Sequence, residues 1–135
     1  MATFQKFNSF VEAIAEKSHN LGSDQLVVAL TNTAPVATNT VLANITEISY
    51  ASLSSRNVTT SSSAQTSGTY KLVLADLVLT ATGSVSAFRY IVLYNDTATN
   101  KELIGYYDYG SSITMGNGDT FTTDFDATNG VLTLV

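Results

Sequence analysis

The spacing of apolar residues changes once along this chain, from a helical period near the N-terminus to a two-residue period beyond it. Four apolar residues recur at spacings of three and four, as on one face of an α-helix: Phe7, Phe10, Val11 and Ile14. Ser9 and Glu12 fit a capping box at the helix start. Gly22 is typical of a residue that follows a helix end. The pattern predicts a helix over residues 8–17.

The rest of the chain predicts β-strands separated by short turns. Residues 25–31 (QLVVALT) are nearly all apolar, which is typical of a strand that is buried on both faces. Pro35 follows and is expected to end this strand, because proline cannot donate a ladder hydrogen bond. Residues 41–48 fit either a short strand or a helical turn. Residues 69–82 fit one long strand, or two strands broken by a bulge at 75–76.

Four further strands are expected in the C-terminal half, where polar or glycine-containing turns separate the apolar segments. In order, they are residues 86–95, 102–109, 120–125 and 131–135. In the first of them, Phe88 and Tyr90 are expected on one face and Ile91 and Leu93 on the other, because side chains alternate along a strand. The second is expected to be its hairpin partner.

A segment of different composition lies between these strands. Residues 49–67 are rich in Ser and Thr and poor in large apolar residues, which predicts a loop or an extended arm with a short strand near 56–60. A solvated loop and a partner-binding arm both fit this composition. Seven to nine strands after one short N-terminal helix indicate a mainly β chain. The expected architecture is an antiparallel β-sandwich, a jelly-roll-like domain or a small barrel. The length of 135 residues fits a single domain.

Composition narrows the classes of function. The chain has no cysteine, which excludes disulfides, thiolate catalysis and cysteine-ligated zinc. The net charge is −5, and no basic cluster suited to nucleic-acid phosphates exists among the scattered cations Lys6, Lys17, Arg56, Lys71, Arg89 and Lys101. No apolar run approaches the roughly 20 residues that cross a membrane. The first ten residues lack the apolar core of a signal peptide, so we expect synthesis in a cytosol.

The sequence offers little for catalysis or metal binding. A Ser-His-Asp triad would need His19, the only histidine, which lies at the predicted helix end where a cation is an ordinary stabilising feature. Residues 124–130 have oxygen ligands spaced loosely as in a calcium loop, but the distal acid is missing. Asp119 and Asp124 would lie on opposite faces of a strand, which suits paired carboxylates poorly. We therefore expect no enzymatic activity, no metal and no cofactor.

Three tyrosines form an aromatic cluster together with Asp108. Tyr106 is expected on one face of its strand, and Tyr107 and Tyr109 on the other. One set fits the core. The other fits an ordinary surface, a protein interface, where tyrosine is favoured, or a sugar-binding platform.

Several stretches of the chain resemble a family of small structural proteins of tailed bacteriophages. The likeness begins with a short aromatic N-terminal segment at residues 4–17. It continues in the motifs L-T-N-T-A-P (30–35), F-R-Y…L-Y-N-D (88–96), L-I-G-Y…D-Y-G (103–110) and N-G-V-L-T-L (129–134). The departure is residues 50–63, which are serine-rich where that family has a more glycine-rich turn.

The resemblance implies a non-enzymatic virion component, a capsid decoration (cement) protein that binds the major capsid protein on the capsid surface. The local threefold axes of a shell favour a homotrimer. The helix and the arm are the expected contact regions, and the candidate interface residues are Phe7, Phe10, Arg56, Tyr107 and Tyr109. The alternative is a tail, fibre or baseplate component that binds a host-surface carbohydrate. No nucleic-acid or membrane partner is expected.

Overall fold

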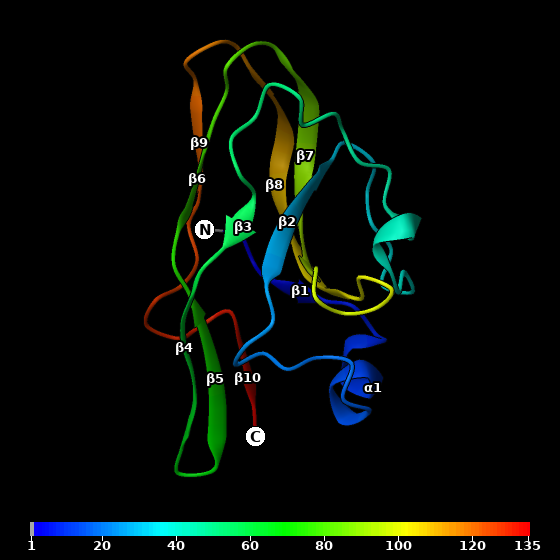
Figure 1. Cartoon of the computed structure of the whole chain (residues 1–135), viewed down its shortest axis with the longest axis vertical. Coiled ribbons are helices and arrows are strands. Elements are labelled where there is room, and N and C mark those ends of the chain that lie inside the picture. The colour runs from blue at the N-terminus through cyan, green and yellow to red at the C-terminus, as the bar shows by residue number, and fades with distance from the viewer. Residues whose placement is uncertain (1) are drawn as a thin grey trace.

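The computed structural model describes residues 2–135, which form ten strands, one short α-helix and one 3-10 turn. All strand pairs are antiparallel, and they build three sheets arranged in two facing layers (Figure 1). The prediction of a mainly β, antiparallel, sandwich-like fold with one short N-terminal helix is confirmed. No helix within residues 2–135 is long and apolar enough to cross a membrane.

The first layer is a five-stranded sheet with the long β7–β8 hairpin at its centre. Its strands, in spatial order, are β1 (Gln5–Lys6), β8 (Leu103–Met115), β7 (Val85–Asn95), β2 (Leu26–Thr31) and β3 (Asn57–Val58). Strand β2 is buried along its whole length, as its apolar sequence predicted. Strand β1 was missed, because two polar residues at a sheet edge carry no hydrophobic period.

The second layer consists of two smaller sheets placed end to end. One contains β10 (Leu132–Leu134), β5 (Thr69–Leu74) and β4 (Thr60–Thr66), and the other pairs β6 (Leu77–Thr80) with β9 (Thr120–Thr123). The predicted break at residues 75–76 is therefore confirmed, but it separates strands of two sheets and is not a bulge within one. The β4–β5 hairpin projects beyond the lower end of the five-stranded sheet in Figure 1.

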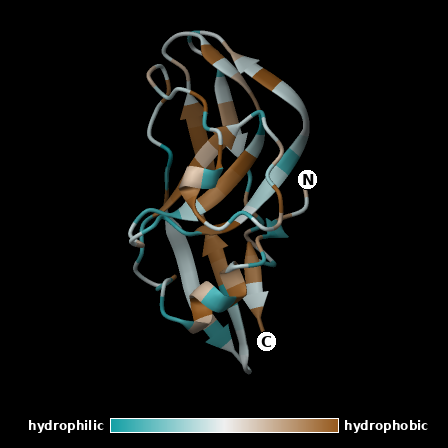
Figure 2. Ribbon diagram, turned by 90° about the vertical axis from the view of Figure 1, so that its right-hand side faces the viewer, coloured by the Kyte–Doolittle hydropathy of each residue, from teal (hydrophilic) through white to brown (hydrophobic). Residues whose placement is uncertain are grey.

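Two hydrophobic clusters cover the two faces of the five-stranded sheet. The larger one fills the space between the layers and includes Phe10, Leu30, Leu72 and Phe88. The smaller one lies on the opposite face and includes buried residues from β2, β7 and the N-terminal segment: Phe7, Val27, Ala29, Val92 and Tyr94. The 3-10 turn η1 (Leu42–Asn44) packs at this smaller cluster. Figure 2 shows the hydrophobic segments gathered in the inner strands, with hydrophilic colour mainly at turns.

Helix α1 (Phe10–Ala15) is shorter than the predicted residues 8–17. The predicted capping box is wrong, because Ser9 has helical backbone angles and makes no side-chain capping bond. The helix ends at Ala15, well before Gly22, and Lys17, two residues after that end, has a left-handed φ of 69°. The Ser18 amide then donates to the Ala13 carbonyl at 2.9 Å, which satisfies one of the free carbonyls of the last turn.

Part of the Ser/Thr-rich segment was also predicted wrongly. Residues 60–66 were assigned to a loop or extended arm beyond the short strand, but they form strand β4, which pairs with β5. Most β4 side chains are exposed, so the strand is held by its backbone ladder and shows no hydrophobic alternation. The short strand expected near 56–60 is confirmed as β3, and the helical-turn alternative for residues 41–48 is confirmed as η1.

The predicted alternation of side chains between the two faces of β7 is wrong in the first half of the strand. The register between β7 and β8 shifts between Phe88, which pairs with Ile113, and Tyr90, which pairs with Asp108. Phe88 therefore joins the larger cluster together with Ile91 and Leu93. Because Phe88 and Ile91 lie three residues apart on the same face, the side-chain alternation is interrupted within β7 itself, close to this register shift.

Candidate functional site

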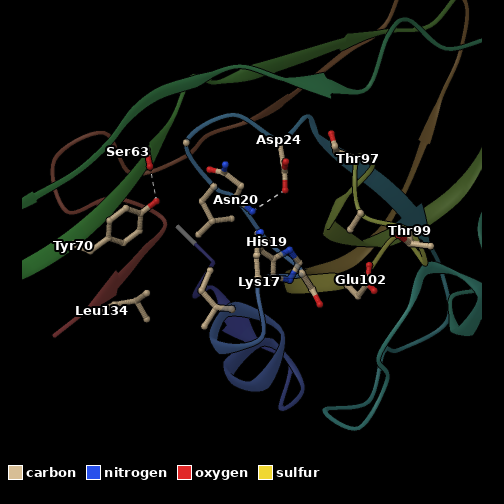
Figure 3. Close-up of a pocket in the computed structure, with 15 residues that line it drawn as sticks. Lys17, His19, Asn20, Asp24, Ser63, Tyr70, Thr97, Thr99, Glu102 and Leu134 are labelled. Carbon is tan, nitrogen blue, oxygen red and sulfur yellow. Dashed lines mark hydrogen bonds between the residues drawn. The ribbon is translucent and has the colours of Figure 1, made fainter.

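A pocket of about 700 Å³ is lined by both polar residues and apolar surface. It lies where four segments converge: the connection from α1 to β2, the β4–β5 hairpin, the β7–β8 turn and strand β10 (Figure 3). We call it the polar pocket. It is lined, among others, by His19, Asp24, Tyr70, Thr99 and Glu102.

His19 is the most deeply buried polar residue of this wall, with 5% of its surface exposed. Its ring stacks on Phe10, with a centroid distance of 5.4 Å. Its Nδ1 atom lies 3.0 Å from Nδ2 of Asn95, a fully buried residue at the end of β7. Figure 3 shows the His19 side chain in the middle of the labelled residues, between Asp24 and Glu102.

Asn95 fixes the arrangement of this cluster. Its Oδ1 accepts hydrogen bonds from the backbone amides of Thr97 and Ala98 at 3.0 and 3.1 Å, so the orientation of the side-chain amide is set. Its Nδ2 group therefore donates, to Asp24 Oδ2 at 2.6 Å and to His19 Nδ1. Because Nδ1 is the acceptor, a neutral His19 must carry its hydrogen on Nε2.

Burial favours this neutral form. Desolvation lowers the pKa of His19 from 6.5, and the negative charges of Glu102 and Asp24 offset only part of that effect. Within residues 2–135, the buried His19 Nε2 has no hydrogen-bond acceptor and the buried Glu102 Oε2 has no donor. The pocket wall thus holds one unused donor and one unused acceptor.

Apolar surface and further polar groups complete the polar pocket. Tyr70 presents a half-buried ring, and its hydroxyl lies 2.8 Å from Ser63 Oγ across the β4–β5 hairpin. Ile14 of α1 and Leu134 of β10 add aliphatic surface to the lining. The walls therefore combine an aromatic and aliphatic area with hydroxyl, amide and carboxylate groups.

The predicted tyrosine cluster lies elsewhere, at a smaller cavity of about 260 Å³ between the layers. Tyr107 and Tyr109 both line it beside Phe121, and Tyr106 packs against Phe7 on the other face, as alternation predicted. Burial raises the pKa of Tyr107 to about 12. Tyr107 is 9% exposed, so only Tyr109, at 54%, presents a large aromatic area to a partner on this face.

The other predicted interface residues have structural positions. Phe7 and Phe10 are buried in the two clusters, so neither presents surface to a partner in this conformation. Arg56 donates from Nη1 to the Val28 carbonyl at 2.6 Å, and its guanidinium lies 3.5 Å from the centre of the Tyr50 ring. It fastens the segment before β3 onto β2. The structure therefore does not bring the five predicted residues together.

The loop considered for calcium is closed by its own hydrogen bonds. Asp126 Oδ1 accepts from the backbone amides of Thr128 and Asn129, both at 2.8 Å. Asp119 Oδ2 accepts from the Gly116 amide at 2.8 Å and so closes the preceding turn. In the described part of the chain, no group of three acidic or histidine side chains is placed to hold a metal ion.

Three residues of this cluster were not predicted from the sequence: Asn95, Asp24 and Glu102. Asn95 was treated as the last residue of the strand 86–95, and its position at the end of a strongly apolar strand, before a polar turn, was the available signal of a buried turn-forming amide. Asp24 and Glu102 carried no local signal, because they meet His19 only through the tertiary fold. In comparisons with known proteins, no family model, no curated protein and no solved structure matches this chain.

Proposed function

We propose that this chain is a non-enzymatic structural protein of a tailed-bacteriophage virion, which decorates the outer capsid shell and stabilises it. The proposal begins from the phage-like motifs of the sequence. On the fold, these motifs lie on β7, β8, β10 and the turn after β2, so they would specify the scaffold. A protein that binds only the assembled shell stabilises it by mass action.

The observation that carries this proposal is the edge strand β4. It is the last strand of its sheet, so one side of its backbone has no neighbouring strand. Its sequence, TSSSAQT, contains no charge and no proline over seven residues, and most of it is exposed. Natural edge strands usually carry charged residues or a proline, which hinder pairing with a further strand. An open, uncharged edge on a projecting hairpin suits a backbone contact with another protein.

The solvent-facing charges are compatible with this role. The chain has a net charge of −5, and its three ion pairs within residues 2–135 are partly exposed and local. Exposed apolar side chains occur singly on several elements, including Val11 on α1 and Val78 on β6. A shell-bound trimer would use contacts of this kind together with β4. The major capsid protein is the partner that the proposal names.

The copy number of the chain in purified particles, relative to the major capsid protein, tests the proposal. A decoration protein should be present at about one copy per capsid subunit, because symmetric binding repeats at each equivalent position. A handful of copies per particle would contradict it and would favour a tail, fibre or baseplate location. Absence from purified particles would reject any virion role.

A further inference from the structure

Two residues that line the polar pocket, His19 and Glu102, each carry a buried side-chain atom without a hydrogen-bond partner. The Nε2–H group of His19 can only donate, and the Glu102 carboxylate oxygen Oε2 can only accept. A hydroxyl group is the simplest partner for both, because it accepts one hydrogen bond while it donates another. Leaving either group buried and unpaired costs free energy, so a hydroxyl placed between them would be favoured.

The remaining walls fit a ligand that carries several hydroxyl groups. The volume of about 700 Å³ lies within the range of small-ligand sites. The exposed hydroxyl of Thr99 and the amide of Asn20 offer further donors and acceptors at the rim. The Tyr70 ring and the Leu134 side chain provide the apolar surface on which the C–H face of a sugar ring can pack.

The charges and ligand groups of the pocket disfavour anions and metal ions. Asp24 and Glu102 face a single cation, Lys17, so the net charge of the lining repels phosphates and acidic sugars. A bound metal ion would need at least three suitable ligands, and no such group occurs among residues 2–135. A neutral molecule with many hydroxyl groups remains as the best match.

We propose that the polar pocket binds a neutral carbohydrate, with one sugar hydroxyl seated between His19 and Glu102. The site is separate from the open edge of β4 and does not depend on a capsid location of the chain. Since both buried atoms are covered in the free protein, side chains at the rim must move to admit the hydroxyl. Thr99 lines the pocket from the exposed β7–β8 turn.

Nuclear magnetic resonance titration of the full chain tests this site directly. The ¹⁵N-labelled protein is titrated with glucose, galactose, mannose and N-acetylglucosamine, with glucuronate and spermidine as charged comparisons. We expect at least one neutral sugar to cause saturable shifts at the amides of Asn20, Gly22 and Thr99. Glucuronate should bind more weakly than its neutral counterpart, glucose, because of the two carboxylates in the wall.

Two variants and one control locate the binding. Glu102→Gln removes the charged acceptor and should weaken sugar binding roughly tenfold, as expected for a lost hydrogen bond to a charged group. Thr99→Trp changes only an exposed residue, so it keeps the fold, and it should abolish binding by filling the rim. Glu12→Gln is the same kind of change as Glu102→Gln but lies on an exposed face of α1, and it should leave binding unaltered.

Three results would overturn the proposal. They are no saturable shift with any of the four sugars, sugar binding that both Glu102→Gln and Thr99→Trp leave unaltered, and occupation of the pocket by spermidine alone. None of these results bears on the copy number in particles, so failure of the carbohydrate site and failure of the decoration role are distinguishable.

Discussion

Asn95 connects the polar pocket to the backbone. Its single buried side chain holds the β7–β8 turn through two amides and holds Asp24 and His19 through its Nδ2 group. Replacing a buried amide that has several partners lowers stability strongly. Each partner is still removed from water, but it no longer has a hydrogen bond to compensate for that loss. The geometry of the pocket thus depends on one residue that does not line it.

Replacing Asn95 with alanine should lower the free energy of unfolding by about 2–4 kcal/mol, since the buried His19 and the turn amides lose their partner. Chemical denaturation followed by far-ultraviolet circular dichroism measures this change. Asn100→Ala is the control, because Asn100 is exposed in the same turn and makes only a 3.4 Å contact to Glu102. Equal losses for the two variants would contradict the assigned role of Asn95.

His19 should make stability depend on pH. Its folded-state pKa lies below the unfolded value of 6.5, so the unfolded chain binds the proton more readily. Stability should therefore be full above pH 6.5 and fall as the pH decreases through the lowered folded pKa. Protonation would also place a second donor opposite Asn95 Nδ2, which breaks the contact to Nδ1.

Denaturant unfolding at several pH values measures this dependence. In a plot of the free energy of unfolding against pH, His19→Gln should remove the decrease that lies just below pH 6.5. It should leave the loss at lower pH, where Asp108 and Asp126 are protonated, because the pKa values of both carboxyls are held below 3.8 by their hydrogen bonds. An unchanged slope in His19→Gln below pH 6.5 would show that His19 is not the group responsible.

At the scale of elements, the period of the hydrophobic residues predicted the elements that turn an apolar face to a core. It located α1, β2, the β7–β8 hairpin and the break between β5 and β6, because their apolar residues face a core. It failed for β4 and for β1, whose places are set by backbone pairing with another strand. It also failed at the end of α1, where Lys17 adopts a left-handed conformation that an L side chain disfavours. The polar pocket, made of four separate segments, had no pattern to reveal it.

The end of α1 offers a direct test of this conformational cost. Lys17→Gly should raise the free energy of unfolding by about 0.5–1 kcal/mol, because glycine adopts a left-handed φ without strain. Thermal or chemical denaturation checks the gain. Ser18→Gly, at the next residue, has no positive φ to relieve and should bring no gain. A loss of stability in Lys17→Gly would show that the lysine side chain matters more than its backbone.

The open edge of β4 can be tested with charges. The double variant Ser62→Lys and Ala64→Lys places two cations on exposed positions of this strand, as natural protected edges do. It should leave the fold intact and weaken binding to purified capsid shells at least about tenfold. The control pair, Thr120→Lys and Thr122→Lys on β9, adds the same charge at exposed positions elsewhere. Equal weakening by both pairs would indicate a general charge effect.

At the scale of the whole molecule, the two hydrophobic clusters are joined through shared strands. Val27 of β2 belongs to the smaller cluster and its neighbour Val28 to the larger one, and Val92 and Leu93 of β7 divide in the same way. Neither cluster can lose its packing without disturbing the strand that serves the other. The larger cluster also receives Leu72 from one small sheet and Leu79 from the other, so it joins all three sheets.

Residues 2–135 should therefore unfold as one cooperative unit. In a denaturant series followed by ¹H–¹⁵N spectra, the folded-state amide signals of Val27 and Ile45 should disappear at the same midpoint as those of Leu72 and Leu79. The first pair reports the smaller cluster and the second pair the larger one. Earlier loss of the second pair would mean that the two small sheets form a separate unit. Earlier loss of the first pair would mean that the smaller cluster opens independently.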